Sequence, residues 1–297
     1  MAFLNLIRWK NLILIVFMAM TIRYALLPSF GQNPSISLPY YLLLISTITC
    51  IAAAGNIINA IFNVTTDSIN RPSKIIIDRV IKRRIALKLY FGLNALGLFT
   101  MLLVLFSNPF VSLWIVFGIC VLSSLALAIY SIWLKKVALL GNILISVIVG
   151  ANFFCFGLAL VNSDQSPVLY FTILTYALVG FSLNLSRELI KNIEDLRGDH
   201  YCKMKTLPIL IGRKRSKHVI FGLLTSTILI LLIILLNYFL SLNIFIFYVF
   251  AFVLIPLILI SKKILKAKNQ KDYASISLHL KLVFLIGISS MFTFLIL

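Results

Sequence analysis

The chain has 297 residues, of which 61% are hydrophobic, and it carries a formal net charge of +19. Its mean hydropathy of +1.07 excludes a soluble domain of this length and predicts a polytopic membrane protein. The basic excess does not indicate nucleic acid, because lysine and arginine fall in alternate loops between apolar runs. The four cysteines have no paired spacing, so we expect neither disulfides nor a cysteine metal site.

Apolar runs of membrane-spanning length follow one another along the chain. They lie at about 12–30, 38–62, 86–107, 110–133, 138–161, 167–187, 218–239, 242–261 and 278–297. The sequence therefore predicts an all-α integral membrane protein, a bundle of nine transmembrane helices that forms a single domain over residues 1–297.

The loops between these runs predict the orientation. Loops after the odd-numbered runs, at 28–37, 107–109, 162–166 and 240–241, contain no lysine or arginine. Twenty of the 27 basic residues lie after the even-numbered runs: Arg71, Lys74, Arg79, Lys82, Arg83, Arg84, Lys135, Lys136, Arg197, Lys203, Lys205, Arg213, Lys214, Arg215, Lys217, Lys262, Lys263, Lys266, Lys268 and Lys271. Positive loops stay inside, so we expect a cytosolic N-terminus, an outward C-terminus and location in the cell inner membrane. Arg23, inside the first run, is the exception.

Five of the eight acidic residues lie in two short segments, each at the inward end of an apolar run. In the first segment Asn59, Asn63 and Asp67 are spaced i, i+4, i+8, which places them on one face if the helix continues. In the second segment Glu188, Asn192, Asp195 and Asp199 are spaced i, i+4, i+7, i+11, which again predicts one helical face. Because carboxylates beside a bilayer are costly unless they serve a function, both segments indicate a site.

Oxygen ligands at this spacing suit Mg²⁺, which is usually shared with substrate phosphates. Cations beside the two segments would hold phosphate oxygens: Arg71, Lys74, Arg187 and Lys191. The alternative interpretation is that these polar residues cap helices, which asparagine and aspartate favour. The presence of two matching segments favours a site over caps.

These segments resemble the motifs of the UbiA superfamily of intramembrane prenyltransferases. The first family motif, N-D-x-x-D-x-x-x-D followed by I-N-R-P, is similar to Asn59 to Asp67 and Ile69 to Pro72. The second, K-D-x-x-D-x-x-x-D, is similar to Lys191 to Asp199. The flanks look most like the branch that makes digeranylgeranylglyceryl phosphate. Tyr130 and Lys135 also match family positions.

The resemblance implies Mg²⁺-dependent transfer of a prenyl group, in the nearest branch geranylgeranyl, from a prenyl diphosphate to a lipid-like acceptor such as geranylgeranylglyceryl phosphate. It implies Asp67, Asp195 and Asp199 as metal-binding, catalytic residues on the cytoplasmic side. The substrate-binding residues would be Asn59, Asn63, Arg71, Lys74, Tyr130, Lys135, Arg187, Lys191 and Asn192. Four aromatic residues are candidates to stabilise a carbocation: Phe62, Tyr130, Phe153 and Phe154. The expected partners are these substrates and membrane lipids, with no protein partner indicated.

The chain departs from the family pattern at Ala60, Asn63 and Asn192, which stand where the family has aspartate. Retained catalysis is therefore one of several hypotheses. A catalytically inactive homologue that binds isoprenoid lipid or an assembly partner is another, and an intramembrane cyclase of prenyl diphosphates is a third. A transporter is disfavoured, because the sequence shows no midplane ion site between broken helices.

Overall fold

A computed structural model describes residues 1–161, 167–238 and 243–296. The first half contains α1 (Ala2–Leu6), α2 (Trp9–Thr21), η1 (Ile22–Leu26), α3 (Leu27–Ser29), α4 (Leu38–Asn70), η2 (Pro72–Lys74), α5 (Arg83–Ser107), α6 (Val111–Ile132) and η3 (Leu134–Lys136). The second half contains α7 (Leu140–Leu160), α8 (Pro167–Glu194), α9 (Leu196–Tyr201), α10 (Leu207–Tyr238), α11 (Asn243–Val249), η4 (Phe250–Leu254), α12 (Ile255–Lys266), α13 (Gln270–Ser289) and η5 (Ser290–Ile296).

Within these residues, nine helical stretches are long and apolar enough to cross a bilayer, as the sequence predicts. The chain is therefore a multi-pass integral membrane protein. Several helices exceed their apolar runs: α4 reaches Asn70, α8 reaches Glu194, and α10 and α13 begin at Leu207 and Gln270. Hydropathy marks where the apolar run stops, whereas backbone hydrogen bonds continue through the polar ends of the helices.

The largest difference between a predicted and an observed helix boundary lies at the start of α10, which begins at Leu207. Residues 213–217, which are rich in lysine and arginine, are helical rather than a loop. Gly212, with φ 81° and ψ 158°, breaks the helix just before them. Glycine adopts this positive φ without a Cβ clash, so a short helical turn precedes the kink and the long spanning helix follows it.

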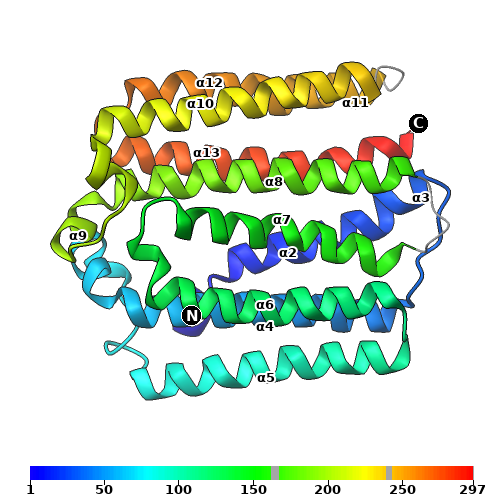
Figure 1. Ribbon diagram of the computed structural model, residues 1–297, viewed down its shortest axis with the longest axis horizontal. Coiled ribbons are helices and arrows are strands. Elements are labelled where there is room, and N and C mark those ends of the chain that lie inside the picture. The colour runs from blue at the N-terminus through cyan, green and yellow to red at the C-terminus, as the bar shows by residue number, and fades with distance from the viewer. Residues whose placement is uncertain (162–166, 239–242, 297) are drawn as a thin grey trace.

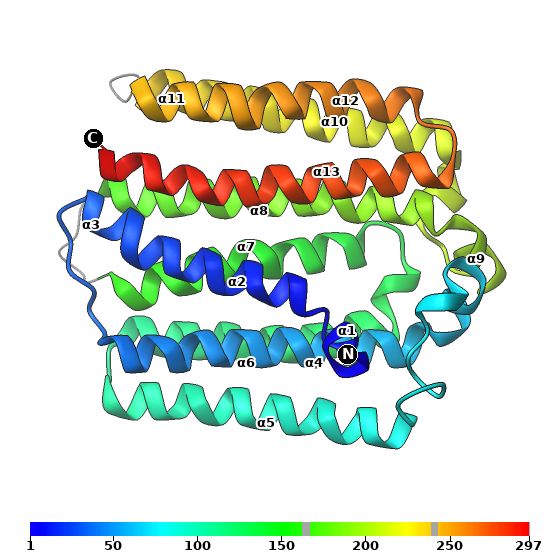
Figure 2. The same ribbon diagram turned by 180° about the vertical axis from the view of Figure 1, so that it is seen from behind.

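The spanning helices lie roughly parallel in one bundle (Figure 1). α8 packs against α7, α10 and α13, while α4 packs against α5 and α6. Seen from behind, α2 crosses obliquely between the α8 and α13 pair and the α4 and α6 pair (Figure 2), and it contacts α4, α7 and α13. α9 and the segment that follows α4 lie together at one end of the bundle, and the C-terminus lies at the other end.

Arg23 lies in the π-helical turn η1 and is only 8% exposed. Its Nη1 donates a hydrogen bond to the carbonyl oxygen of Ile36 at 3.0 Å, and its guanidinium lies 5.1 Å from the ring centroid of Tyr41. The tyrosine hydroxyl in turn donates to the carbonyl of Ala19 at 2.7 Å. The protein therefore solvates this intramembrane cation by itself, without exposing it to lipid.

Candidate active site

A cavity of about 280 Å³ opens between α2, α4, α6, α7 and α8 at the α9 end of the bundle. Its polar end carries five basic side chains, Arg8, Arg71, Lys135, Arg187 and Lys191, and four acidic ones, Asp67, Glu188, Asp195 and Asp199. Its interior is apolar and is lined by Ile48, Ile51, Ile119, Ile145, Ile148 and Val149. The cavity thus combines a charged mouth with a hydrocarbon-like interior.

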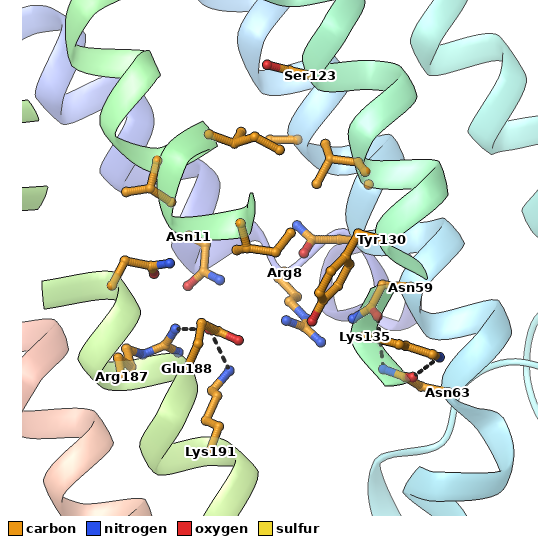
Figure 3. A pocket seen from close by; sticks show the side chains of 18 of the residues that line it. Arg8, Asn11, Asn59, Asn63, Ser123, Tyr130, Lys135, Arg187, Glu188 and Lys191 are labelled. Carbon is orange, nitrogen blue, oxygen red and sulfur yellow. Dashed lines mark hydrogen bonds and ion pairs between the residues drawn. The ribbon is translucent and has the colours of Figure 1, made fainter. Parts of the chain in front are cut away.

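One side of the cavity is formed by α4. The helix runs unbroken through Asn59, Asn63 and Asp67, so the three side chains share the cavity face as the spacing predicts. Asn63 donates to Asn59 Oδ1 at 3.0 Å and accepts from the Lys135 ammonium (Figure 3). Lys135 also donates to the carbonyl of Phe62 at 2.9 Å. Burial lowers the pKa of Lys135 to about 8, so its charged ammonium form still predominates at pH 7.

Ala60 faces away from the cavity. Its side chain packs against a separate apolar cluster that includes Leu6, Ile57 and Ala86, and it does not line the cavity. Of the two replaced positions in the first motif, only Asn63 therefore belongs to the site.

The opposite side of the cavity is formed by the end of α8. Arg187 Nη1 lies 3.2 Å from Glu188 Oε1, and Lys191 Nζ lies 3.9 Å from the same oxygen (Figure 3). Asn192 donates to Asn142 Oδ1 on α7 at 3.0 Å, so the third replaced position bridges two helices at the cavity wall. One carboxylate thus faces two cations here, which leaves positive charge on this side.

The second acidic segment does not continue as one helix. α8 ends at Glu194, Asp195 adopts φ −93° and ψ 9°, and α9 begins at Leu196. Burial raises the pKa of Asp195 to about 6 and that of Asp199 to about 7. Repulsion between the acidic residues adds to both shifts, whereas Arg71 opposes the shift of Asp195. Both carboxyl groups line the cavity, Asp195 from the break itself and Asp199 from α9.

Residues at the end of α4 hold the break between α8 and α9 in place. Asn70 donates to the carbonyl of Asp195 and accepts from the backbone N–H of Gly198, both at 2.9 Å. Arg71 Nη2 lies 2.8 Å from both Glu194 Oε1 and Asp195 Oδ1. The residues that follow the first motif therefore hold the second motif in place, a contact that joins positions more than a hundred residues apart.

The donor set fits a hard divalent cation that is shared with a ligand. Asp67, Asp195 and Asp199 supply carboxylate oxygens to one cavity. The repulsion that raises the pKa of Asp199 is what a cation between these groups would relieve. Among the described residues, no three acidic, histidine or cysteine side chains lie close enough to hold a metal by themselves. The remaining ligands would therefore be water or phosphate oxygens.

The structure brings most of the predicted site residues to this cavity. It is lined by Asn59, Asn63, Asp67, Arg71, Tyr130, Lys135, Arg187, Lys191, Asn192, Asp195 and Asp199. The side chain of Lys74 lies outside what the structure describes. Sequence reasoning missed Arg8 and Asn11, which reach the cavity from the start of α2. A positive φ of 54° at Arg8 turns the chain there, and no sequence pattern signals it.

The four aromatic candidates differ in whether they line the cavity. Tyr130 lines the cavity and points into its polar end (Figure 3). Phe62 is 39% exposed and its ring lies 5.8 Å from the guanidinium of Arg83. Phe153 is buried in the core and, like Phe154, does not line this cavity. Tyr130 is therefore the candidate that the geometry leaves for contact with a cationic carbon.

Residues 12–285 match the sequence model of the UbiA prenyltransferase family. The chain belongs to this family. Its match to the digeranylgeranylglyceryl phosphate synthase of Thermococcus kodakarensis is 32% identical over 197 residues, which is 66% of this chain and 65% of that protein. The chain thus matches just under two thirds of the length of that curated relative.

Solved structures share the fold over nearly the whole chain. A structure of digeranylgeranylglyceryl phosphate synthase in membranes superposes with a TM-score of 0.69 at 27% identity, covering 98% of this chain and 96% of that chain. A UbiA homologue from Archaeoglobus fulgidus bound to GPP and Mg²⁺ superposes with a TM-score of 0.63 at 16% identity, covering 98% and 99%. The UbiA fold therefore extends through all nine spans that the structure describes.

Proposed function

We propose that this membrane protein is a Mg²⁺-dependent prenyltransferase built as one domain over residues 1–297. It transfers a prenyl group, geranylgeranyl by its nearest relatives, from a prenyl diphosphate to a lipid-like acceptor. The observation that carries this proposal is the convergence of both acidic segments, with five cations, on the mouth of an apolar cavity. A prenyl diphosphate has the matching shape, with a highly charged head on a hydrocarbon chain.

Each part of the cavity has a role in this proposal. Arg71, Lys135, Arg187 and Lys191 hold the diphosphate oxygens, assisted by the amides of Asn59, Asn63 and Asn192. The apolar interior takes the prenyl chain and excludes water. Asp67, Asp195 and Asp199 hold Mg²⁺, which when bound neutralises the charge of the leaving diphosphate.

Transfer breaks the allylic C–O bond, whose electron pair leaves with the diphosphate. The acceptor hydroxyl oxygen forms the new C–O bond and its proton passes to the released diphosphate. The cations at the cavity mouth stabilise the negative charge that develops on the leaving group. The face of Tyr130 stabilises positive charge on the allylic carbon.

The relatives support the choice of substrates. The curated relative from Thermococcus kodakarensis is named digeranylgeranylglyceryl phosphate synthase. We therefore assign a geranylgeranylglyceryl phosphate type of acceptor. By the positive-inside rule, the cavity faces the cytoplasm from the cell inner membrane, because the basic loops lie at the cavity end.

The first test is binding and turnover of radiolabelled geranylgeranyl diphosphate by the purified protein in lipid nanodiscs, with and without Mg²⁺. Asp195→Asn and Asp199→Asn remove one charge each and nearly preserve shape. We expect each to weaken Mg²⁺-dependent binding about tenfold or more, because ligand charge sets affinity for a hard cation. Asp78→Asn is the matched control, since Asp78 is exposed and keeps its Oδ1 contact with the backbone N–H of Arg83 as asparagine.

Absence of Mg²⁺-dependent binding in the wild-type protein would overturn the proposal and favour an inactive homologue. Product analysis with the diphosphate as the sole substrate separates the remaining alternative. A cyclised hydrocarbon product would indicate a cyclase, because a cyclase needs no acceptor.

A further inference from the structure

A second cavity of about 140 Å³ adjoins the first one, between α2, α7, α8 and α13. Four polar residues line both cavities: Asn11, Asn152, Asn184 and Arg187. The remaining lining is mainly apolar and comprises Leu14, Ile15, Met18, Val149, Leu183, Leu280 and Phe284, with Lys281 as the one further polar residue. This second cavity therefore has the amphiphilic character of the first, but different helices form its wall.

The charge of the second cavity is entirely positive. Among the residues that the structure describes, its charged lining residues are Arg187 and Lys281, and no carboxylate lines it. Lys281 Nζ donates to Asn11 Oδ1 at 2.7 Å. Arg187 Nη1 contacts Glu188 at 3.2 Å, but its Nε is buried and has no hydrogen-bond partner among the described residues. A buried donor without a partner is unfavourable, so this nitrogen points to an anionic ligand.

The first cavity does not provide the same environment. Its cations Arg71 and Lys191 already face the carboxylates of Asp195 and Glu188. Lys281 lies on α13, well outside both acidic segments, and does not line the first cavity. The two cavities thus offer two anion-binding positions that share the Arg187 side chain.

We propose that Arg187 and Lys281 bind the phosphomonoester headgroup of an amphiphilic acceptor, with Asn11 and Asn184 as further donors. A phosphomonoester carries about −1.5 to −2 charges at pH 7, which matches two cations without a neighbouring carboxylate. The apolar lining takes the hydrocarbon part of the acceptor. Because the two cavities share four polar lining residues, a headgroup held here lies beside the diphosphate end of the donor. This inference deepens the proposed function and rests on it for the role of the ligand as acceptor.

The test measures equilibrium binding of radiolabelled geranylgeranylglyceryl phosphate to the full-length protein in phosphatidylcholine nanodiscs, without Mg²⁺ or prenyl diphosphate. Lys281→Met keeps the length of the side chain and removes its charge. We expect the Kd to rise about tenfold or more, as for loss of a charge-assisted hydrogen bond in a buried site. Lys271→Met is the matched control on the same helix, because Lys271 is exposed, and its Kd should stay within about twofold.

A second binding measurement uses the same amphiphile without its phosphate. The wild-type protein should bind this alcohol at least about tenfold more weakly, and Lys281→Met should not weaken it further. Equal binding of the two amphiphiles by the wild-type protein would overturn the proposal, whatever the variant does. Lys281→Arg should restore most of the affinity, which shows that charge rather than folding is responsible.

Competition binding distinguishes a phosphomonoester acceptor from a phosphodiester lipid of the bilayer as the ligand of this site. Phosphatidylglycerol, a phosphodiester of the bilayer, should compete weakly, and competition as strong as that of the monoester would overturn the acceptor assignment. The assay contains no donor, so its outcome is independent of turnover. Phosphate-dependent acceptor binding without any transfer would refute the proposed function and leave this anion site intact.

Discussion

Two replaced positions in the first motif have different structural consequences. Asn63 lies on the cavity face and contacts Lys135, whereas Ala60 packs in an apolar cluster outside the cavity. Compared with the family's sequence motif, both positions have lost a carboxylate. Of these two positions, only Asn63 removes a carboxylate from the cavity, and an alanine at position 60 suits its apolar neighbours.

We predict that Asn63→Asp changes ligand affinity, whereas Ala60→Asp changes stability. Asn63→Asp should tighten Mg²⁺-dependent binding of prenyl diphosphate by roughly three- to tenfold, because it adds a carboxylate to the proposed metal-binding face. Ala60→Asp should leave that affinity unchanged and lower stability by about 1–3 kcal/mol, because it buries a polar group among apolar side chains. Binding titrations and thermal unfolding in detergent measure the two quantities.

Each variant serves as the control for the other, since both place an aspartate on the same turn of α4. An equal gain in Mg²⁺ affinity from Ala60→Asp would mean that position 60 also faces the bound metal. An unchanged affinity in Asn63→Asp would remove Asn63 from the metal-binding face.

At the scale of elements, the break between α8 and α9 is the feature that shapes the site. It depends on close contact between α4 and α9, because Asn70 bonds to the carbonyl of Asp195 at the break and to the N–H of Gly198 in α9. Gly198 permits this contact. A Cβ at that position would lie 2.4 Å from Asn70 Nδ2 and 2.7 Å from the carbonyl oxygen of Thr66.

We therefore predict that Gly198→Ala separates α9 from α4. The backbone oxygen of Thr66 cannot rotate away, so the clash should lower stability by about 1–3 kcal/mol and move Asp195 and Asp199 off the cavity. Prenyl diphosphate binding should weaken together with thermal stability. Gly222→Ala on α10 is the control, because its Cβ would meet nothing within 4 Å and alanine favours a helix. If the Gly198→Ala variant were as stable as the wild-type protein, the close contact between α9 and α4 would not be needed for the fold.

At the scale of the whole molecule, the basic connections gather at the end of the bundle that holds α9 and the cavity mouth (Figure 1). The positive-inside rule then predicts which side of the membrane the substrate enters from. In a background without native cysteines, His200→Cys on α9 and Asn33→Cys at the opposite end report this directly, since both positions are exposed. A membrane-impermeant maleimide should label Asn33→Cys in intact cells and His200→Cys in inverted vesicles. The reverse pattern would place the cavity on the outer side.

Composition and residue spacing predicted the fold class, the number of spans and the two segments that meet at the candidate site. Apolar runs of bilayer length and their alternating basic loops depend on local composition, which a sequence states directly. The spacing of Asn59, Asn63 and Asp67 likewise predicted their shared face, because they lie on one unbroken helix.

Other features of the site come from the packing of the helices and have no local sequence pattern. The tertiary structure broke the second segment at Asp195, turned Ala60 away from the cavity and brought Lys281 of α13 beside Arg187 of α8. It also showed that Asn70 and Arg71 hold the second motif in place. These features depend on contacts between helices that are far apart in sequence. Packing of side chains across the bundle fixes such contacts, whereas hydropathy and periodicity describe each helix by itself.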